Sequence, residues 1–586
     1  MAAQKIENLI TDHLDLWSAA VRPKSSAGRG SNSKLELTGI KKLRELILEL
    51  AVRGKLVPQD PSDEPASVLL ECIAAEKARL VKEEGLRTSA NEVVDIADEY
   101  IECPSHWKWA RLGNIAKFID YRGKTPNKID AGVRLITAKN IRYGYIDLVP
   151  EEFISEADYD QWMTRGFPRV GDTLFTTEAP LGNAAVIDIN ERFALAQRAI
   201  CFQWHYSTVS RFMLIQILAS PFQNQLIDNS SGMTATGVKA SRLKEIPVVI
   251  PPAEEQQRIV AKVDELMALC DQLEQCSESQ LAAHQTLVET LLATLTDSCD
   301  ADELAQNWAR LSTHFDTLLT TEASIEALKQ TILQLAVMGK LVPQDPSDEP
   351  ASALLARIAA EKAQLVKEKK IKKEKPLPAI SEDEKPFELP KGWVFERIAV
   401  FGLVGTGATP SRSNPAYWEP AEINWVSSGE TAELFVGKTK EQISNLAIKE
   451  TNVSIYPVGT LIVAMYGQGK TRGQITELLE PAGTNQACAA IRLIDETKSH
   501  KDFVKLFFRK AYLELREHAA GGAQPNLNVG KIASTVIPLP PIPEQHRIVA
   551  KVDELMTLCD QLKSRLQTSQ QTQLALAESL VEGALS

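Results

Sequence analysis

The residues best suited to bind a polyanion lie in short loops rich in Gly, Pro and Ser, within two separate blocks of the chain. The loops are DYRGKTPNK (120–128), ITAKNIRYGY (136–145), TPSRSNP (409–415), WVSSGE (425–430) and MYGQGKTRG (465–473). Arg and Lys bind guanine or phosphate, Asn and Gln pair with adenine, and Ser and Thr accept or donate to either. Contact with nucleic acid is therefore one interpretation of these loops, and an ordinary solvated turn is the other.

We take as candidate contact residues the polar side chains of these loops and of three further segments, FPRVGDTLFTT (167–177), SGMTATGVKAS (231–241) and GGAQPNLNVGK (521–531). In the first block they are Arg122, Lys124, Thr125, Lys139, Asn140, Arg142, Thr176, Thr177 and Lys239. In the second block they are Thr409, Ser411, Arg412, Ser427, Ser428, Tyr466, Gln468, Lys470, Arg472, Gln524 and Asn526.

Two of these loops resemble catalytic motifs but lack essential parts of them. A phosphate loop requires a glycine where this chain has Ala464, five residues before the glycine of GKT. NPAYW (414–418) resembles the Asn-Pro-Pro-Tyr motif of adenine methyltransferases, but its third residue is Ala416 and no room precedes it for a cofactor fold. We see no Ser-His-Asp set and no CxxC pair, so we expect no catalytic residues and no metal site.

The elements that must position these loops are duplicated. GKLVPQDPSDEPAS occurs unchanged at 54–67 and at 339–352, and each copy lies within a longer similar stretch. IVAKVDELMALCDQL (259–273) is repeated with one change at 548–562. We call the duplicated segments the frame. Along the chain, frame segments therefore alternate with the two blocks, in the order frame, block, frame, block, frame. Two copies of such length indicate an internal pseudo-dimer rather than a stacked array.

Each copy of the second repeat predicts a helix with one apolar seam. The seam residues recur in steps of four and three: Ile259, Val263, Leu266, Cys270 and Leu273, then Ile548, Val552, Leu555, Cys559 and Leu562. Each seam could pack within its own domain, or the two seams could pack on each other. We favour the second alternative because surface positions are identical as well. Helices of about 35 to 40 residues would be ~50–60 Å long. They could hold two DNA-reading blocks more than one turn of duplex, ~34 Å, apart.

The blocks share landmarks and otherwise diverge. Each begins with a Pro turn, a Trp and a loop ending in Thr-Pro, and short β-branched runs broken by Gly and Pro follow. We predict an α+β fold with two mixed α/β target-recognition domains separated by long paired antiparallel helices. The expected segments are 1–102 (helical, with a flexible linker and the first frame repeat), 103–252 (first domain), 253–388 (helical spacer with the second frame repeat), 389–541 (second domain) and 542–586 (a helix pairing with the central one).

Charge and composition are compatible with this division. Net charge is −12 over 586 residues, but the blocks at 103–250 and 390–541 carry +3 and +2, so the remainder carries −17. Slightly basic blocks in an acidic frame can contact phosphates. The N-terminal residues lack a signal-peptide pattern, and no apolar run is long enough to span a membrane. We therefore expect a cytoplasmic protein with free thiols.

The chain resembles the specificity subunits of type I restriction–modification systems. The resemblance rests on two copies of an Ile-Pro-rich entry to a helix, IPVVIPPAEEQQRIV (246–260) and IPLPPIPEQHRIV (537–549), on tandem blocks entered through a Thr-Pro loop, and on the duplicated helices. It covers essentially the whole chain. The first copy departs from the pattern at Ala253-Glu254, where Ile542-Pro543 stand in the second.

The resemblance implies a noncatalytic DNA-recognition subunit that serves in defence against phage. Each domain would read half of a bipartite, asymmetric site in double-stranded DNA, and the paired helices would set the spacing. Two methyltransferase subunits and the restriction (translocase) subunits would dock on the chain, and S-adenosylmethionine, ATP and Mg would bind to those partners. The alternative from the residues alone is a noncatalytic scaffold whose blocks bind proteins.

Overall fold

The computed structural model describes residues 8–23, 35–84, 94–121, 126–196, 198–231, 237–299, 301–373, 377–467, 471–518 and 527–585. These residues form two compact units. Of the described residues, unit 1 contains 8–23, those between 35 and 280 and 569–585, and unit 2 contains those between 281 and 568. The division between the units falls within the two long helices, near residues 280 and 568.

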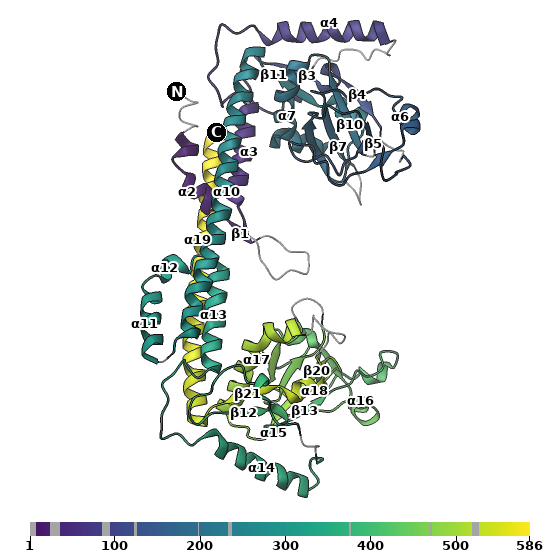
Figure 1. The fold of residues 1–586 in the computed structure, drawn as a ribbon. Coiled ribbons are helices and arrows are strands. Elements are labelled where there is room, and N and C mark those ends of the chain that lie inside the picture. Colours follow the sequence, from purple (N-terminus) through teal and green to yellow (C-terminus); the bar gives the residue numbers. More distant parts are fainter. Residues whose placement is uncertain are drawn as a thin grey trace. The chain divides into compact units, whose positions relative to one another are not determined.

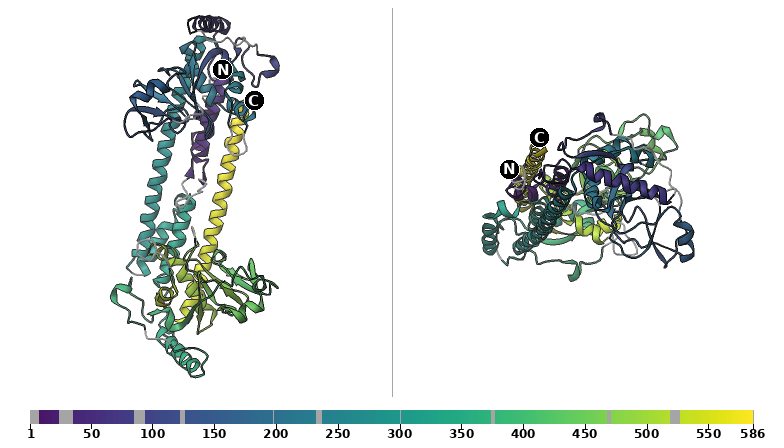
Figure 2. Two further views of the ribbon diagram at one scale, coloured as in Figure 1. Left: turned by 90° about the vertical axis from the view of Figure 1, so that its right-hand side faces the viewer. Right: turned by 90° about the horizontal axis from the view of Figure 1, so that it is seen from above.

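The frame of unit 1 is helical (Figure 1). It contains α2 (Leu14–Ala19), the small strands β1 (Arg22–Pro23) and β2 (Leu35–Glu36), α3 (Thr38–Val52), α4 (Ala66–Glu84) and the first part of α10 (Ala253–Asp297). The last part of α19 (Ile542–Leu585) completes it. Ion pairs join α3 to both long helices, from Arg44 to Asp271 and from Lys42 to Glu578. Figure 2 shows α3 between α10 and the C-terminal part of α19.

The block of unit 1 consists of three sheets and short helices. Its strands are β3 (Lys108–Arg111), β4 (Ala116–Asp120), β5 (Val133–Ile136), β6 (Phe153–Ile154), β7 (Thr173–Thr177), β8 (Leu181–Val186), β9 (Phe193–Leu195), β10 (Ala199–Trp204) and β11 (Pro247–Ile250). Its helices are α5 (Leu112–Ile115), α6 (Glu156–Trp162), α7 (Ser210–Leu218), α8 (Ser220–Asp228) and α9 (Ala240–Glu245). The sheet orders are β4-β10-β7-β8, β6-β5-β9 and β11-β3. One apolar core fills the space between the first two sheets.

The frame of unit 2 repeats that of unit 1. It contains the end of α10, α11 (Ala301–Ser312), α12 (Phe315–Leu318), α13 (Glu322–Val337), α14 (Ala351–Lys367) and the first part of α19. Buried residues from the end of α10 (Val288, Leu292), from α13 (Ile332) and from the start of α19 (Val552) share one core. The end of one long helix and the start of the other therefore belong to one cluster, as antiparallel helices require.

The block of unit 2 has the same strand topology with one strand, β15, added at the edge of its large sheet. Its strands are β12 (Val394–Arg397), β13 (Gly402–Thr406), β14 (Ile423–Val426), β15 (Phe435–Val436), β16 (Glu441–Ile443), β17 (Leu461–Ala464), β18 (Ile475–Leu478), β19 (Ala482–Thr484), β20 (Cys488–Leu493) and β21 (Val536–Leu539). Its helices are α15 (Ile398–Phe401), α16 (Asn445–Glu450), α17 (Lys498–His518) and α18 (Val529–Ser534). The orders are β13-β20-β17-β18-β15, β16-β14-β19 and β12-β21.

The two blocks thus share one scaffold although little of their sequence matches. In each block the first and last strands pair antiparallel, β3 with β11 and β12 with β21. In each, the small sheet contains one parallel pair, β5 with β9 and β14 with β19. The predicted fold class, two mixed α/β domains joined by long antiparallel helices, is confirmed.

Candidate nucleic-acid interface

The frame holds each block through a buried carboxylate near the start of a long helix. In unit 1, Glu255 accepts a hydrogen bond from Trp107 Nε1 at 3.0 Å. In unit 2, Glu544 accepts from Trp393 Nε1 at 2.9 Å. Both carboxylates are almost fully buried. The tryptophan that opens each block is therefore fixed to the helix that follows that block.

The identical fourteen-residue stretch makes the same contacts in both units. Asp63 pairs with Arg258 at 2.5 Å, and Asp348 pairs with Arg547 at 2.6 Å. Gly339 has φ +71°, and a Cβ there would lie 2.5 Å from Pro390 Cγ. Its counterpart Gly54 has the same restriction against Pro104. Identical neighbours in the two units account physically for an identical sequence.

Each apolar seam packs within its own unit. Ile259, Val263, Leu266 and Cys270 are buried in unit 1, whereas Ile548, Val552 and Cys559 are buried in unit 2. Leu273, Leu555 and Leu562 are half-buried. The unit 2 seam shares its core with α13, which is the first of the two alternatives. Antiparallel helices explain this, because the start of one then faces the end of the other.

The strand order of the first block places several strand ends, and the loops that follow them, at one edge of the large sheet. β10 is antiparallel to both β4 and β7, and β7 is antiparallel to β8. The ends of β4 and β7 therefore lie at the same edge as the starts of β8 and β10. Gly237 joins this edge through a bridge to Glu178. We call Asp120, Thr176–Ala179, Arg198 and Gly237–Lys239 the loop edge of unit 1.

Three first-block candidates are buried and shape loops instead of facing solvent. Thr176 Oγ1 accepts from Asn183 N at 3.0 Å, and Thr177 Oγ1 donates to Arg198 O at 3.2 Å. Asn140 accepts from Thr137 N and donates to two backbone carbonyls of the same loop. Because these polar groups are buried and already paired inside the protein, Thr176, Thr177 and Asn140 shape the loops, and their contact with DNA stays a prediction.

The cationic first-block candidates are accessible. Lys139 lies 3.6 Å from Glu152, with two thirds of its side chain exposed. Arg142 pairs with Asp147 at 3.2 Å, and Lys239 lies on the loop edge just before α9. A backbone hydrogen bond from Val149, together with Arg142, lowers the pKa of the Asp147 carboxyl. Arg122, Lys124 and Thr125 lie outside the described residues.

In unit 2 the corresponding edge carries an arginine stacked on an indole. Arg412 lies 4.1 Å from the centre of the Trp418 ring and pairs with Glu441. The bond from Arg412 lowers the pKa of the Glu441 carboxyl. Thr409 Oγ1 donates to Gln486 Oε1 at 2.6 Å, and the hydroxyl of Ser411 bonds to that of Ser413. Arg412 is thus an accessible guanidinium in a preset orientation.

The remaining second-block candidates differ in exposure. Ser427 caps a short helical turn by bonding to Glu430, and the Ser428 carbonyl accepts from Thr431. Tyr466 packs partly against the core of unit 2, and Arg472 is half-buried. Gln468, Lys470, Gln524 and Asn526 lie outside the described residues.

Sequence reasoning missed Arg198 and Glu178. Arg198 Nε lies 3.1 Å from Glu178 Oε1 on the loop edge of unit 1, and both side chains are accessible. Arg198 adopts φ +60°, an uncommon conformation for a residue other than glycine. The sequence signal was an arginine directly before a β-rich run, ALAQRAICFQW, which is too common to single out.

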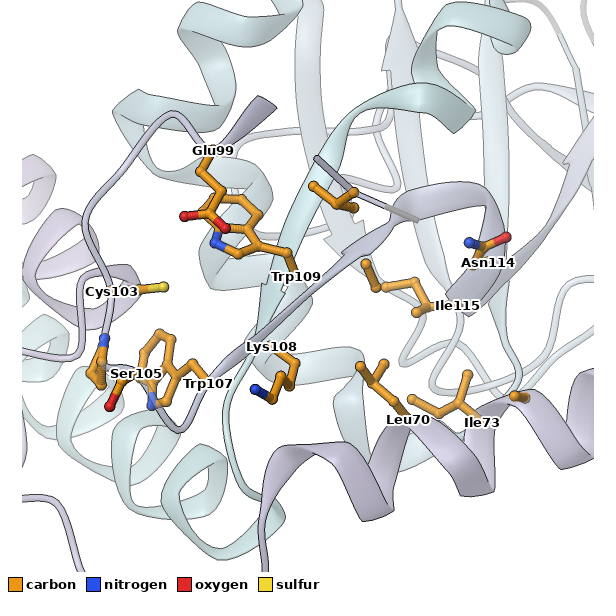
Figure 3. A pocket seen from close by; sticks show the side chains of 14 residues that line it. Leu70, Ile73, Glu99, Cys103, Ser105, Trp107, Lys108, Trp109, Asn114 and Ile115 are labelled. Carbon is orange, nitrogen blue, oxygen red and sulfur yellow. The ribbon is translucent and has the colours of Figure 1, made fainter. Parts of the chain in front are cut away.

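A groove lies at the first strand of each block. In unit 1 it has a volume of about 510 Å³, and Leu70 and Ile73 of α4 line one wall opposite Trp107 and Trp109 (Figure 3). In unit 2 a groove of about 980 Å³ follows the equivalent strand, β12. Each groove thus lies along the first strand of its block, β3 or β12, and not at the loop edge.

Other kinds of site are missing from the part of the chain that the structure describes. No three His, Cys, Asp or Glu side chains in those ranges lie where they could hold a metal ion together. Among the same residues, no helix combines the length and the apolar composition needed to cross a membrane.

The geometry defines a duplicated protein: one frame built twice, with two equivalent blocks that differ at their loop edges. Residues 104–283 and 390–569 match the family "Type I restriction modification DNA specificity domain". The type I restriction enzyme EcoEI specificity subunit of Escherichia coli is 40% identical over 99% of this chain and its own full length. The EcoAI specificity subunit of the same species is 39% identical over 99% and 100%.

The chain therefore belongs to the family of type I restriction–modification specificity subunits, and its two blocks are DNA-recognition domains. One solved structure, of a type I system described in terms of complex assembly and conformational transition, covers 82% of this chain and 98% of its own. Its sequence identity to this chain is 17% and its TM-score is 0.47.

Proposed function

We propose that the chain is a noncatalytic subunit that directs a type I restriction–modification complex to a split, asymmetric site in double-stranded DNA. The observation that carries the proposal is the pair of matched scaffolds with unlike loop edges. Thr177 N donates to Arg198 O, and Met465 N donates to Ala487 O in the equivalent place. Side chains that differ on equal backbones are what two readers of different half-sites require.

The frame is the part suited to bind partner proteins, because its contacts occur twice. Two equivalent surfaces would receive two methyltransferase subunits, and restriction subunits would join that complex. S-adenosylmethionine, ATP and Mg would then bind to the partners, as an adenine methyltransferase and a DNA translocase require. The proposed complex works in the cytoplasm, where the DNA is.

The long helices would set the distance between the half-sites. α10 has 45 residues and α19 has 44, and each contributes residues to both units. A continuous helix rises about 1.5 Å per residue and resists compression. The gap between half-sites would therefore depend on helix length and not on the loops.

Exchange of one block tests the proposal. Residues 103–250 are replaced by the matching block of the EcoAI relative, and N6-methyladenine is mapped across the genome of cells that also express the partner subunits. The expected result is a new sequence in one half-site, with the other half and the gap unchanged. Exchange of 390–541 is the matched control and should change only the other half. A change in both halves from one exchange would contradict modular reading.

A further inference from the structure

We propose that Arg198 and Glu178 together read one G·C base pair in the half-site of the first block. This inference rests on the proposed function and adds a residue pair to it. In the major groove a guanine presents two acceptors, O6 and N7, and its cytosine presents one donor, the N4 amino group. A guanidinium beside a carboxylate offers donors and acceptors in the complementary arrangement.

The pair is accessible where duplex could reach it. About half of the Arg198 side chain and over a third of the Glu178 side chain are exposed. Their contact joins Arg198 Nε to Glu178 Oε1, so it does not require the two Nη groups. Those groups form the fork that donates to O6 and N7 of guanine. The carboxylate can accept from cytosine N4 with its second oxygen.

The backbone at this place is held in an unusual form. Arg198 has φ +60° and Ala179 has φ +43°, and the register between β7 and β8 shifts between Phe175 and Thr177. The Arg198 carbonyl accepts from both the amide and the hydroxyl of Thr177. Such conformations persist where the surroundings fix them, and they cluster at binding sites. Here they fix the direction in which the Arg198 side chain leaves the sheet.

The second block shows that the scaffold itself does not need this pair. Trp204 of β10 pairs with the first residue of β4, and Leu493 of β20 pairs with the first residue of β13, so Trp204 and Leu493 are equivalent positions. Arg198 lies six residues before Trp204 and Ala487 lies six residues before Leu493, so these two are equivalent as well. The shared hydrogen bond to the neighbouring strand aligns Thr177 with Met465, and therefore Glu178 with Tyr466. The same edge is thus built with an alanine and a tyrosine. Because the fold of the block does not require Arg198 and Glu178, these two residues are free to determine which base pair is recognised.

A nearby carboxylate also argues for a base contact over a phosphate contact. A phosphate would meet the Glu178 charge as well as that of Arg198, and like charges repel. A base edge carries no net charge and can use both groups. The expected signature is therefore a preference at one base pair, with little effect on affinity for unrelated sequences.

Selection from a library of randomised duplexes tests the pair with the full-length chain. Arg198→Lys keeps the charge but removes the planar fork, so its preference at one G·C pair should fall about ten-fold or more while the other half-site stays unchanged. Glu178→Gln should weaken the preference at the same pair. The matched control is Arg211→Lys, because Arg211 is equally exposed and paired with Asp264 on the frame helix α10.

Three results would overturn the inference. The first is an unchanged motif in both variants, and the second is a motif changed at different base pairs by the two variants. The third is equal weakening on every sequence, which indicates a phosphate contact. Failure of the wild-type chain to select any split motif would instead contradict the proposed function. Thermal unfolding should match the wild type for all variants, since Lys tolerates φ +60° as Arg does.

Discussion

At the scale of single residues, the buried carboxylate that anchors the second block pairs with neutral donors. Glu544 accepts from Trp393 Nε1 at 2.9 Å and from Gln344 Nε2 at 2.7 Å. Burial raises the pKa of Glu544, and these two donors and Arg547 oppose the rise. A raised pKa in the folded state means that the folded protein holds this proton more tightly than the unfolded chain does.

Glu544→Gln should therefore cost most at acidic pH. The stabilising contribution of a group with a raised folded pKa is complete below its unfolded pKa, near 4.5, and is lost as pH rises through the folded pKa. Chemical unfolding of the wild type and the variant between pH 4 and 8 measures the difference. Glu554→Gln, on the exposed side of the same helix, is the control and should change stability little. A penalty that grows toward neutral pH would show that the partners favour the charged carboxylate.

Residue type alone could select candidate loops but could not predict which of their side chains face solvent. Thr176, Thr177 and Asn140 have the right chemistry for base contact, yet their polar groups are used inside the protein. Arg412 has the same chemistry and remains accessible. Arg198 escaped prediction because its partner Glu178 lies twenty positions away and its φ cannot be read from a sequence.

At the scale of elements, the last carbonyls of each long helix accept hydrogen bonds from a lysine of the repeated stretch. Lys340 Nζ donates to the carbonyls of Thr296 and Ser298, at 2.6 and 2.9 Å, at the end of α10. Lys55 Nζ donates to the Leu585 carbonyl, at 2.6 Å, at the end of α19. The last carbonyls of a helix lack partners within it, and they carry partial negative charge that a cation stabilises.

Lys340→Met should loosen the last turn of α10. Methionine keeps the apolar stem but removes the ammonium, at an expected cost of about 1 kcal/mol to unit 2. Amide exchange of residues 292–298 should quicken, because the last turn of α10 frays more readily once Lys340 no longer holds the carbonyls of Thr296 and Ser298. Exchange in α17 should not change. Lys438→Met is the control, because Lys438 is an exposed lysine of the same unit. Unchanged exchange at the end of α10 would show that water serves the carbonyls as well as Lys340 does.

The helices themselves were predictable, but their neighbours were not. Apolar residues in steps of four and three indicate that one side of a helix is buried, but they do not identify the helix that covers it. The pattern therefore could not show that Ile548 and Val552 pack against α13 and not against the other seam. The two copies of GKLVPQDPSDEPAS do meet equal neighbours, as the matched ion pairs of Asp63 and Asp348 show.

At the scale of the whole molecule, the proposed function assigns reading of the half-sites to the blocks and their spacing to the frame. The loop edges differ between the blocks while the frame contacts are the same. Changes in the frame should therefore alter spacing without altering either half-site. The length of α10 and α19 is the simplest such variable, because both helices contribute residues to both units.

Removal of seven residues from α10 around position 280, together with seven from α19 around position 568, should shorten the gap and leave both half-sites intact. Seven residues keep the apolar stripe in phase and remove about 10 Å of helix. Since duplex rises about 3.4 Å per base pair, the gap should lose about three base pairs. Methylation mapping reads this directly. Removal of five residues from each helix is the out-of-phase control, because it rotates the stripe by about 140° and should abolish methylation. An unchanged gap in the seven-residue variant would mean that the helices do not set the spacing and that the bound partners or the DNA bend determine it instead.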